Sequence, residues 1–279
     1  MAGILSPVTA TVTRTTGALD LDAYLARVGF EGRPAADLKT LQALHVGHVG
    51  RIPFENLVIQ TGGVPSLEIE DLQAKLVTAG RGGYCFEQNT LFMAVLREIG
   101  FDVQPREGRV MLTISARRPR THMALEVASG GARYHADVGF GANGPLLPIP
   151  LDGGEHVQGD RTFRFEQRGD QNVLQSNFGK RWLDLVGLEP RYPQPVDFEV
   201  ANWFTATHPR SVFRTNLMAD LQTPAERHRL QNRTYTHVAN GTSTERTLGD
   251  DEVITLLAEV FGLIEAPGTR FLAFDEHNR

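Results

Sequence analysis

The stretch Arg81-Gly82-Gly83-Tyr84-Cys85-Phe86-Glu87-Gln88-Asn89 contains the only cysteine of the 279-residue chain. A single thiol excludes an internal disulfide framework and a paired-cysteine site. The two glycines predict a turn, and the apolar residues after Cys85 predict a helix, so the sulfur should lie at a helix N-terminus. Free backbone N–H groups and the helix dipole favour a thiolate there, and the thiolate is the form that attacks carbonyl carbon. The alternative that Cys85 is simply a small buried hydrophobe stays open.

Two further residues supply the groups that a nucleophilic cysteine needs. His122 begins an apolar stretch typical of a strand, and Asp137 ends the next predicted strand, after a turn at Gly130-Gly131. Pairing of these strands would bring both side chains together if they point to one face. Cys85, His122 and Asp137 would then be nucleophile, base and orienting acid. A polar histidine at a strand start and a turn-forming aspartate are the alternatives.

Composition limits the class of protein. The chain is longer than the usual range of about 100–200 residues per domain, so we expect two or three domains. Its net charge of −5 gives no basic field for nucleic acid or anionic lipid. No stretch approaches the roughly 18 apolar residues of a membrane span. Residues 1–16 are expected to form a flexible tail without a secretory signal, and a single cysteine suggests a reducing, cytoplasmic location.

Residues 20–100 show the periodicity of helices. Apolar residues recur at helical spacing before Gly29, before Pro53, and after Cys85 as far as Gly100, which should end the last helix. The expected helices cover residues 21–28, 38–46, 71–77 and 85–99.

From Phe101 onward the period changes to two, which indicates strands. The Gly169-Asp170 and Gly179-Lys180 turns favour a meander or a small barrel. The strands expected there cover residues 103–113, 122–127, 134–138, 162–167, 172–176 and 181–186. Beyond them we expect a helix at 198–205, strands at 213–221 and 234–238, and a final helix at 250–261. Asp250 or Asp251 should cap that last helix, and Gly262 should end it.

The stretch around Cys85 resembles the Arg-Gly-Gly-x-Cys-x-Glu-x-Asn signature of arylamine N-acetyltransferases. Other segments resemble motifs of the same family, in the family's order, and the resemblance covers about residues 20 to 260. These segments are Ile52-Pro53-Phe54-Glu55-Asn56-Leu57, Thr121-His122, Asp137-Val138-Gly139-Phe140-Gly141 and Pro209-x-Ser211-x-Phe213.

The resemblance implies an α+β fold of three domains with a Cys-His-Asp core like that of cysteine proteases. An N-terminal helical bundle would carry the nucleophile (17–100), a central antiparallel β-barrel would carry His122 and Asp137 (101–208), and an α/β lid would follow (209–279). It also implies acetyl transfer from acetyl-CoA, through acetyl-Cys85 and by a ping-pong mechanism, to a small arylamine, N-hydroxyarylamine or arylhydrazine. No metal, nucleic-acid or membrane partner is expected, and the oligomeric state is left open.

The resemblance also suggests binding residues. Phe54, Phe140 and Phe213 would line the acceptor pocket, where flat rings suit a flat amine; plain core packing is the alternative. Thr121, Gly139 and Gly141 would contact the cofactor, with backbone N–H groups near Gly139 and Gly141 facing CoA phosphates; an ordinary turn is the alternative there.

Supporting roles are expected for Arg81 and Glu55. The resemblance implies a buried ion pair between them that holds the turn before Cys85, so that Arg81→Ala should fold poorly. His45 and His48 stand at helical spacing, but no third ligand follows them, so we expect no metal there.

Three other functions would fit parts of this pattern. A papain-like or transglutaminase-like hydrolase uses the same three residue types and would consume acetyl-CoA without an arylamine. An amide synthase of macrocycle biosynthesis resembles the same family but takes another substrate. A non-catalytic binding fold would leave Cys85 no more reactive than a free thiol.

Overall fold

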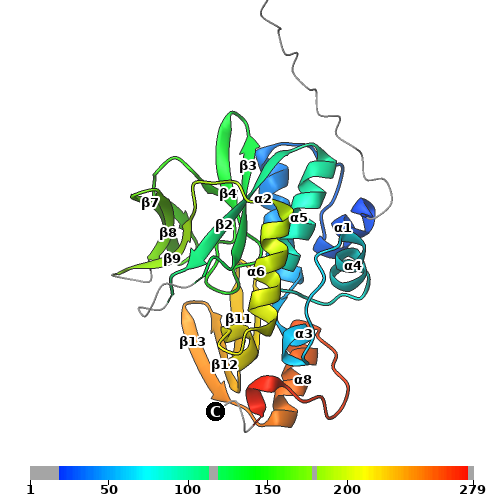
Figure 1. Cartoon of the computed structure of the whole chain (residues 1–279). Coiled ribbons are helices and arrows are strands. Elements are labelled where there is room, and N and C mark those ends of the chain that lie inside the picture. Colours follow the sequence, from blue (N-terminus) through cyan, green and yellow to red (C-terminus); the bar gives the residue numbers. More distant parts are fainter. Residues whose placement is uncertain (1–18, 113–118, 178–180, 276–279) are drawn as a thin grey trace, which may run out of the picture.

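The computed structural model describes residues 19–112, 119–177 and 181–275. Figure 1 shows the helices of the first hundred residues packed beside a curved green sheet, with a second, orange sheet and helix α8 below them. The expected tail at 1–16 and the Gly179-Lys180 turn lie outside the described residues. Among the described residues, no helix is long and apolar enough to cross a membrane.

The N-terminal part is helical, as expected. Asp20 caps the first helix by accepting a hydrogen bond from the Ala23 N–H at 2.9 Å, and Gly29 ends it in the left-handed conformation at φ 65°. A buried apolar core joins these helices to the central sheet. The helices are α1 (Leu21–Val28), α2 (Leu38–Arg51), α3 (Leu57–Gln60), α4 (Ile69–Leu72), the π-helical segment η1 (Gln73–Thr78) and α5 (Cys85–Ile99).

The central sheet is antiparallel and barrel-like, with strand order β5-β4-β3-β2-β9-β8-β7-β6. The Gly130-Gly131 turn has positive φ at both residues, which suits a tight hairpin between β3 and β4. The short edge strands β5 and β6 were not expected from the sequence. The bounds are β2 (Asp102–Val110), β3 (His122–Ser129), β4 (Ala132–Ala136), β5 (Ile149–Pro150), β6 (His156–Gln158), β7 (Arg161–Arg168), β8 (Gln171–Asn177) and β9 (Trp182–Leu188).

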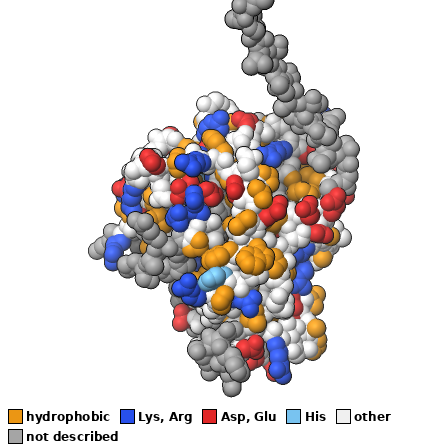
Figure 2. Space-filling model, viewed as in Figure 1, with side chains coloured by type: hydrophobic (Ala, Val, Ile, Leu, Met, Phe, Trp, Pro, Cys, Tyr) orange, Lys and Arg blue, Asp and Glu red, His pale blue; other side chains and the backbone are white. Residues whose placement is uncertain are grey.

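The C-terminal part is a second antiparallel sheet covered by α8 on one face. Its elements are α6 (Pro195–Thr207), α7 (Val212–Thr215), β10 (Met218–Gln222), β11 (Glu226–Gln231), β12 (Thr234–Ala239), β13 (Thr242–Thr247), α8 (Asp250–Phe261) and the 3-10 turn η2 (Leu272–Phe274). Figure 2 shows charges of both signs scattered over one face of the molecule, with hydrophobic side chains gathered near its middle.

Two expectations for this part are wrong. The strand predicted at 213–221 begins only at Met218, because the Ser211 hydroxyl accepts a hydrogen bond from the Phe213 N–H and starts the short helix α7. Helix α8 is capped at Gly249, and neither Asp250 nor Asp251 is its N-cap. The Glu252 carboxylate accepts a hydrogen bond from the Gly249 N–H at 2.7 Å, which satisfies that end of the helix.

The N-terminal and C-terminal parts interlock. Strand β1 (Phe54–Glu55) pairs with β10 and so becomes an edge of the C-terminal sheet. The Asn56 and Gln60 amides donate hydrogen bonds to the carbonyls of Phe213 and Asn216. The three-domain fold is present, while the domain boundaries at 100/101 and 208/209 stay predictions.

Candidate active site

Cys85 is the first residue of α5 and is 2% exposed. The turn before it must be glycine-rich, because a Cβ at Gly82 would lie 2.1 Å from the carbonyl oxygen of Pro53. Backbone hydrogen bonds tie Gly83 to Pro53 (3.2 Å) and to Glu55 (3.0 Å), so the turn is fastened to β1. Cys85 therefore follows a turn that backbone hydrogen bonds hold in place.

His122 and Asp137 lie together at one end of the β3–β4 hairpin. The register places Leu125 opposite Ala136, so His122 and Asp137 become diagonal neighbours on one face when that register is continued. His122 Nε2 lies 2.6 Å from Asp137 Oδ2, and both residues are buried. Next to His122, the carbonyl oxygen of Thr121 lies 3.8 Å from Cys85 Sγ.

The electrostatics of this pair favour a charged imidazole. Burial alone would lower the pKa of His122, but the charge and hydrogen bond of Asp137, together with a hydrogen bond and charge at Cys85, raise it to about 10. Burial would likewise raise the pKa of Asp137, but the charge and hydrogen bond of His122 lower it to about 2. The Asp137 carboxylate thus contacts Nε2 of the His122 imidazolium, and Cys85 is a second neighbour that favours the charged ring.

Two buried residues, Asn89 and His45, hold Asp137 in place through hydrogen bonds. The Asn89 amide donates to Asp137 Oδ1 at 2.9 Å and to the carbonyl of Met123 at 2.8 Å, while its oxygen accepts from the Val138 N–H at 3.2 Å. His45 Nε2 accepts from the Asp137 N–H at 3.1 Å, and its Nδ1 lies 2.9 Å from the carbonyl of Leu146. Sequence reasoning assigned neither role, although Asn89 stands in the quoted motif.

Both ring nitrogens of His45 are thus engaged with backbone groups of Asp137 and Leu146. The neighbouring His48 lies 2.9 Å from the Tyr24 hydroxyl through Nδ1, and both histidines are buried. Burial lowers the pKa of His45 to about 4 and that of His48 to about 3, so both rings are neutral.

The expected Arg81–Glu55 ion pair is wrong. Arg81 pairs with Glu265 and donates to the carbonyl of Ile264, both on the segment after α8. Lys75, on η1, takes the expected place of Arg81, lying 3.4 Å from Glu55 and 2.7 Å from Glu87. The Glu87 carboxylate also accepts from the Tyr84 N–H at 3.1 Å, so this group supports the turn before Cys85 directly.

Two of the three predicted acceptor residues, Phe54 and Phe140, lie in one pocket with Asp137. The Phe140 ring meets the His122 ring edge-on, with centroids 5.1 Å apart. Phe54 and Phe140 line a pocket with Asp137, Gly141 and residues of β10. Phe213 packs against Phe54, with centroids 6.2 Å apart, and against Tyr84, but is not part of that pocket lining.

The two glycines predicted to contact the cofactor are required by packing. A Cβ at Gly139 would lie 2.6 Å from Cys85 Cα, and one at Gly141 would lie 2.6 Å from Asp220 Oδ2. Gly141 also has φ +79°, where L side chains are strained. Their contact with a cofactor stays a prediction, as does that of Thr121.

The sequence also matches known proteins over most of its length. A family model described as N-acetyltransferase covers residues 37–266. An arylamine N-acetyltransferase of Mycolicibacterium smegmatis is 38% identical over 255 residues, which span 88% of this chain and 92% of that protein. The chain belongs to the arylamine N-acetyltransferase family.

Two other members of the arylamine N-acetyltransferase family are informative. One from Salmonella typhimurium, 33% identical over 87% of this chain and 88% of its own, is named arylamine N-acetyltransferase / N-hydroxyarylamine O-acetyltransferase. The solved structure of Mycobacterium marinum arylamine N-acetyltransferase in complex with CoA matches with a TM-score of 0.83 and 35% identity, over 88% of this chain and 93% of that one. The expected family, fold and acyltransferase class are thus confirmed.

Proposed function

We propose that this chain transfers an acetyl group from acetyl-CoA to an arylamine, N-hydroxyarylamine or arylhydrazine through acetylated Cys85. The observation that carries the proposal is the buried His122 ring, held by Asp137 at 2.6 Å, with Cys85 as a further interacting neighbour. The names of the relatives support arylamine and N-hydroxyarylamine acceptors, and the CoA complex supports the donor class. The arylhydrazine acceptor is a further part of the proposal.

The first half-reaction starts from a Cys85 thiolate beside a His122 imidazolium. The sulfur attacks the thioester carbonyl, the new carbon–sulfur bond forms, and the bond to the CoA sulfur breaks. The leaving CoA sulfur takes the proton of His122, which becomes neutral. Free N–H groups in the first turn of α5 are suited to stabilise the oxyanion formed on the way.

The second half-reaction restores the enzyme. The amine nitrogen attacks the acetyl-Cys85 carbonyl while neutral His122 takes a proton from that nitrogen. Cys85 leaves as a thiolate and the product is an amide or, from a hydroxylamine oxygen, an ester. Such base catalysis is typically worth about 10²–10⁴-fold in rate. One site used by both substrates in turn requires ping-pong kinetics.

Phe54 and Phe140 suit the acceptor role, because their rings border the pocket that reaches Asp137. Phe213 supports Phe54 from behind. Thr121, Gly139 and Gly141 remain the predicted cofactor contacts, and a cytoplasmic location remains a prediction.

Intact-mass analysis after mixing with acetyl-CoA tests the proposal. We expect one added acetyl group on the parent chain, its absence in Cys85→Ala, and its discharge by aniline. The surface variant His156→Gln is the control for His122→Gln, which should lose acetylation. Loss of the acetyl group to water alone would favour the hydrolase, and an adduct stable to every arylamine would favour the amide synthase. An unmodified parent chain would contradict the proposal.

A further inference from the structure

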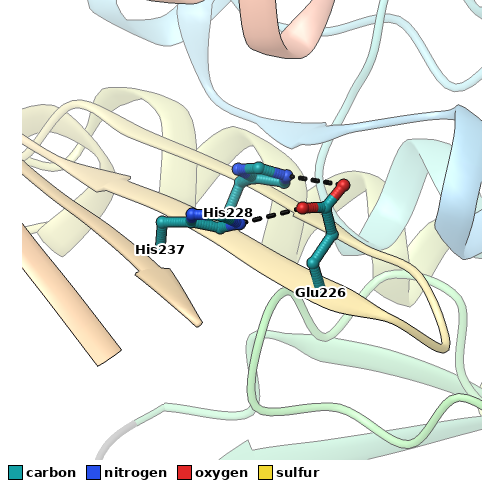
Figure 3. A group of neighbouring side chains, drawn as sticks. All are labelled: Glu226, His228 and His237. Carbon is teal, nitrogen blue, oxygen red and sulfur yellow. Dashed lines mark hydrogen bonds and ion pairs between the residues drawn. The ribbon is translucent and has the colours of Figure 1, made fainter. Parts of the chain in front are cut away.

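Three metal-binding side chains gather on one face of the C-terminal sheet, outside the site described above. Glu226 and His228 alternate on β11, so both point to the same face. His237 on β12 lies directly opposite His228 in the antiparallel register. Figure 3 shows both imidazole rings directed at the Glu226 carboxylate.

The three ligand atoms converge closely. His237 Nε2 lies 2.9 Å from Glu226 Oε2, and His228 Nε2 lies 3.4 Å from Glu226 Oε1. One ligand atom from each residue falls within 4.8 Å of the others. Around a tetrahedral ion with bonds of about 2.0–2.1 Å, ligand atoms lie roughly 3.3 Å apart. The two His–Glu distances are close to that value but involve different carboxylate oxygens, so the remaining spacing of up to 4.8 Å must shorten when the ion binds.

We propose that Glu226, His228 and His237 bind a divalent late first-row transition ion, of which Zn²⁺ is the representative. A donor set of two imidazoles and one carboxylate favours such ions over Mg²⁺ or Ca²⁺, and it leaves one coordination position for water. The two rings are nearly parallel, at 5° with centroids 4.5 Å apart. Closure around the ion needs each ring to turn about its terminal torsion, which is broad for histidine.

The surroundings hold the ligands in place. The Tyr235 hydroxyl lies 2.8 Å from His228 Nδ1, which leaves Nε2 as the ligand atom. Tyr235 is itself packed in the core under α8. At Glu226, the carbonyl accepts from the Thr223 N–H at 2.8 Å and the N–H donates to the Thr223 hydroxyl at 3.1 Å, so the backbone is fixed.

Two neighbouring arginines have interaction partners of their own. Arg227 alternates to the other face and forms a two-pronged pair with Asp160 at 2.7 and 2.8 Å. Arg246, opposite Tyr235 on β13, is stacked over the Tyr235 ring at 5.5 Å. The ligand side chains are 14–42% exposed, which leaves an entry path from solvent.

An ion bound here would join β11 to β12 beside β10. Leu221 of β10 lies opposite His228, and Asp220, Leu221 and Gln222 of β10 line the pocket near Asp137. The site would therefore stabilise the sheet that forms one wall of that pocket. It is independent of the proposed acetyl transfer, because none of its three ligands takes part in that reaction.

Zn²⁺ titration of the untagged full-length chain by calorimetry tests the site. The Cys85→Ala variant removes the competing thiol, and we expect it to bind one Zn²⁺ per chain. In that background His237→Ala and Glu226→Gln should each weaken binding by at least roughly 100-fold, and Tyr235→Phe by roughly 10–100-fold. His156→Gln, which disrupts the exposed pair with Asp152, is the matched control and should leave affinity unchanged.

Co²⁺ provides an independent reading. In the Cys85→Ala background the visible absorption bands of Co²⁺ should appear on binding and should be absent when Glu226→Gln is added. That substitution is nearly isosteric, and circular dichroism checks that the variant is folded. Absence of Zn²⁺ binding in Cys85→Ala would overturn the proposal. So would equally tight binding by His237→Ala and Glu226→Gln, because the ion would then lie elsewhere.

Discussion

At the scale of single residues, the proposed chemistry depends on how firmly Asp137 is held. Its two carboxylate oxygens have separate tasks: Oδ2 faces His122, while Oδ1 accepts hydrogen bonds from Asn89 and from the Gly139 N–H. The orientation of the His122 imidazole is therefore fixed through Asp137, which Asn89 and the Gly139 N–H hold in turn.

The His122–Asp137 pair should make stability depend on pH in a definite direction. The pKa of His122 rises from 6.5 to about 10, so its contribution is complete below pH 6.5 and is lost as the pH rises toward 10. The pKa of Asp137 falls from 3.8 to about 2, so its contribution is present above pH 3.8 and is lost as the pH falls toward 2. The pair contributes most between these limits.

We therefore expect Asp137→Asn to lower the free energy of unfolding by about 3–5 kcal/mol near pH 5, and by progressively less above pH 6.5. Urea unfolding across pH 4–9.5 measures this. Asp152→Asn, at an exposed histidine pair, is the control and should show no such profile. A pH-independent cost for Asp137→Asn would rule out a charged pair.

Asn89→Ala should lower the rate of Cys85 acetylation without unfolding the protein. A hydrogen bond to a charged group is worth about 1.5–3 kcal/mol, which corresponds to roughly a 10–100-fold loss of rate. Stopped-flow release of CoA measures the acetylation step. The adjacent Thr90→Ala is the control, and equal rates in the two variants would show that Asn89 does not position Asp137.

At the scale of elements, the ion pairs that support the Gly82-Gly83 turn before Cys85 differ from the pair that the family resemblance suggested. Lys75 is held between Glu55 and Glu87 beneath that turn, whereas Arg81 reaches outward to Glu265. Burial raises the pKa of Glu87 to about 7 against the opposing effect of Lys75. A missing lysine would therefore leave two carboxylates facing each other in the core.

Lys75→Met should consequently destabilise the protein much more than Arg81→Ala. Breaking the buried group should cost about 3–5 kcal/mol of unfolding free energy. Removing the partly exposed Arg81, whose side chain is 29% exposed, should cost only about 0–1 kcal/mol. Denaturant unfolding of the two variants measures both costs. An unfolded Arg81→Ala variant would show that Arg81, and not only Lys75, is essential for folding.

Local sequence predicted the elements that have local causes. Helices α5 and α8 begin and end where the apolar period and the glycines Gly100 and Gly262 indicate, and Gly130-Gly131 placed the β3–β4 hairpin. Strand β13 was missed because all six of its residues are exposed and carry no alternating pattern. Ladder pairing with β12, not side-chain burial, makes it a strand.

The same distinction applies to the candidate site. Cys85, His122 and Asp137 were proposed from a motif and from strand pairing, and the structure brings them together. His45 reaches Asp137 across 92 residues of sequence, and Lys75 replaces Arg81 through the path of η1. Such contacts depend on how distant elements pack, which local patterns do not encode.

At the scale of the whole molecule, one buried cation ties the pocket to both sheets. Arg161 on β7 donates to the carbonyl of Ala142 at 3.1 Å and to the Gln222 amide oxygen on β10 at 2.7 Å. The Gln222 amide in turn donates to the carbonyl of Gly144 at 3.1 Å. The segment 142–144, which lines the pocket, is thus fixed between the barrel-like sheet and the C-terminal sheet.

Arg161→Met should release this segment. Two buried acceptors would lose their donor, at a cost of about 1–3 kcal/mol in unfolding free energy, and the KM for the arylamine should rise more than kcat falls. Steady-state kinetics with a series of anilines measures the effect. Arg164→Met, from the half-buried side of the same strand, is the control; matching kinetic defects would show that β7 matters only for general stability.

The interlocked β1 strand has a consequence for how the enzyme is made. The side-chain amides of Asn56 and Gln60 donate to a carbonyl that lies more than 150 residues later in the chain. A ribosome-bound nascent chain can thus expose the finished cysteine segment while the partners of Asn56 and Gln60 are still untranslated. Reactivity toward thioesters should therefore appear only after the segment that contains Phe213 and Asn216 has been translated.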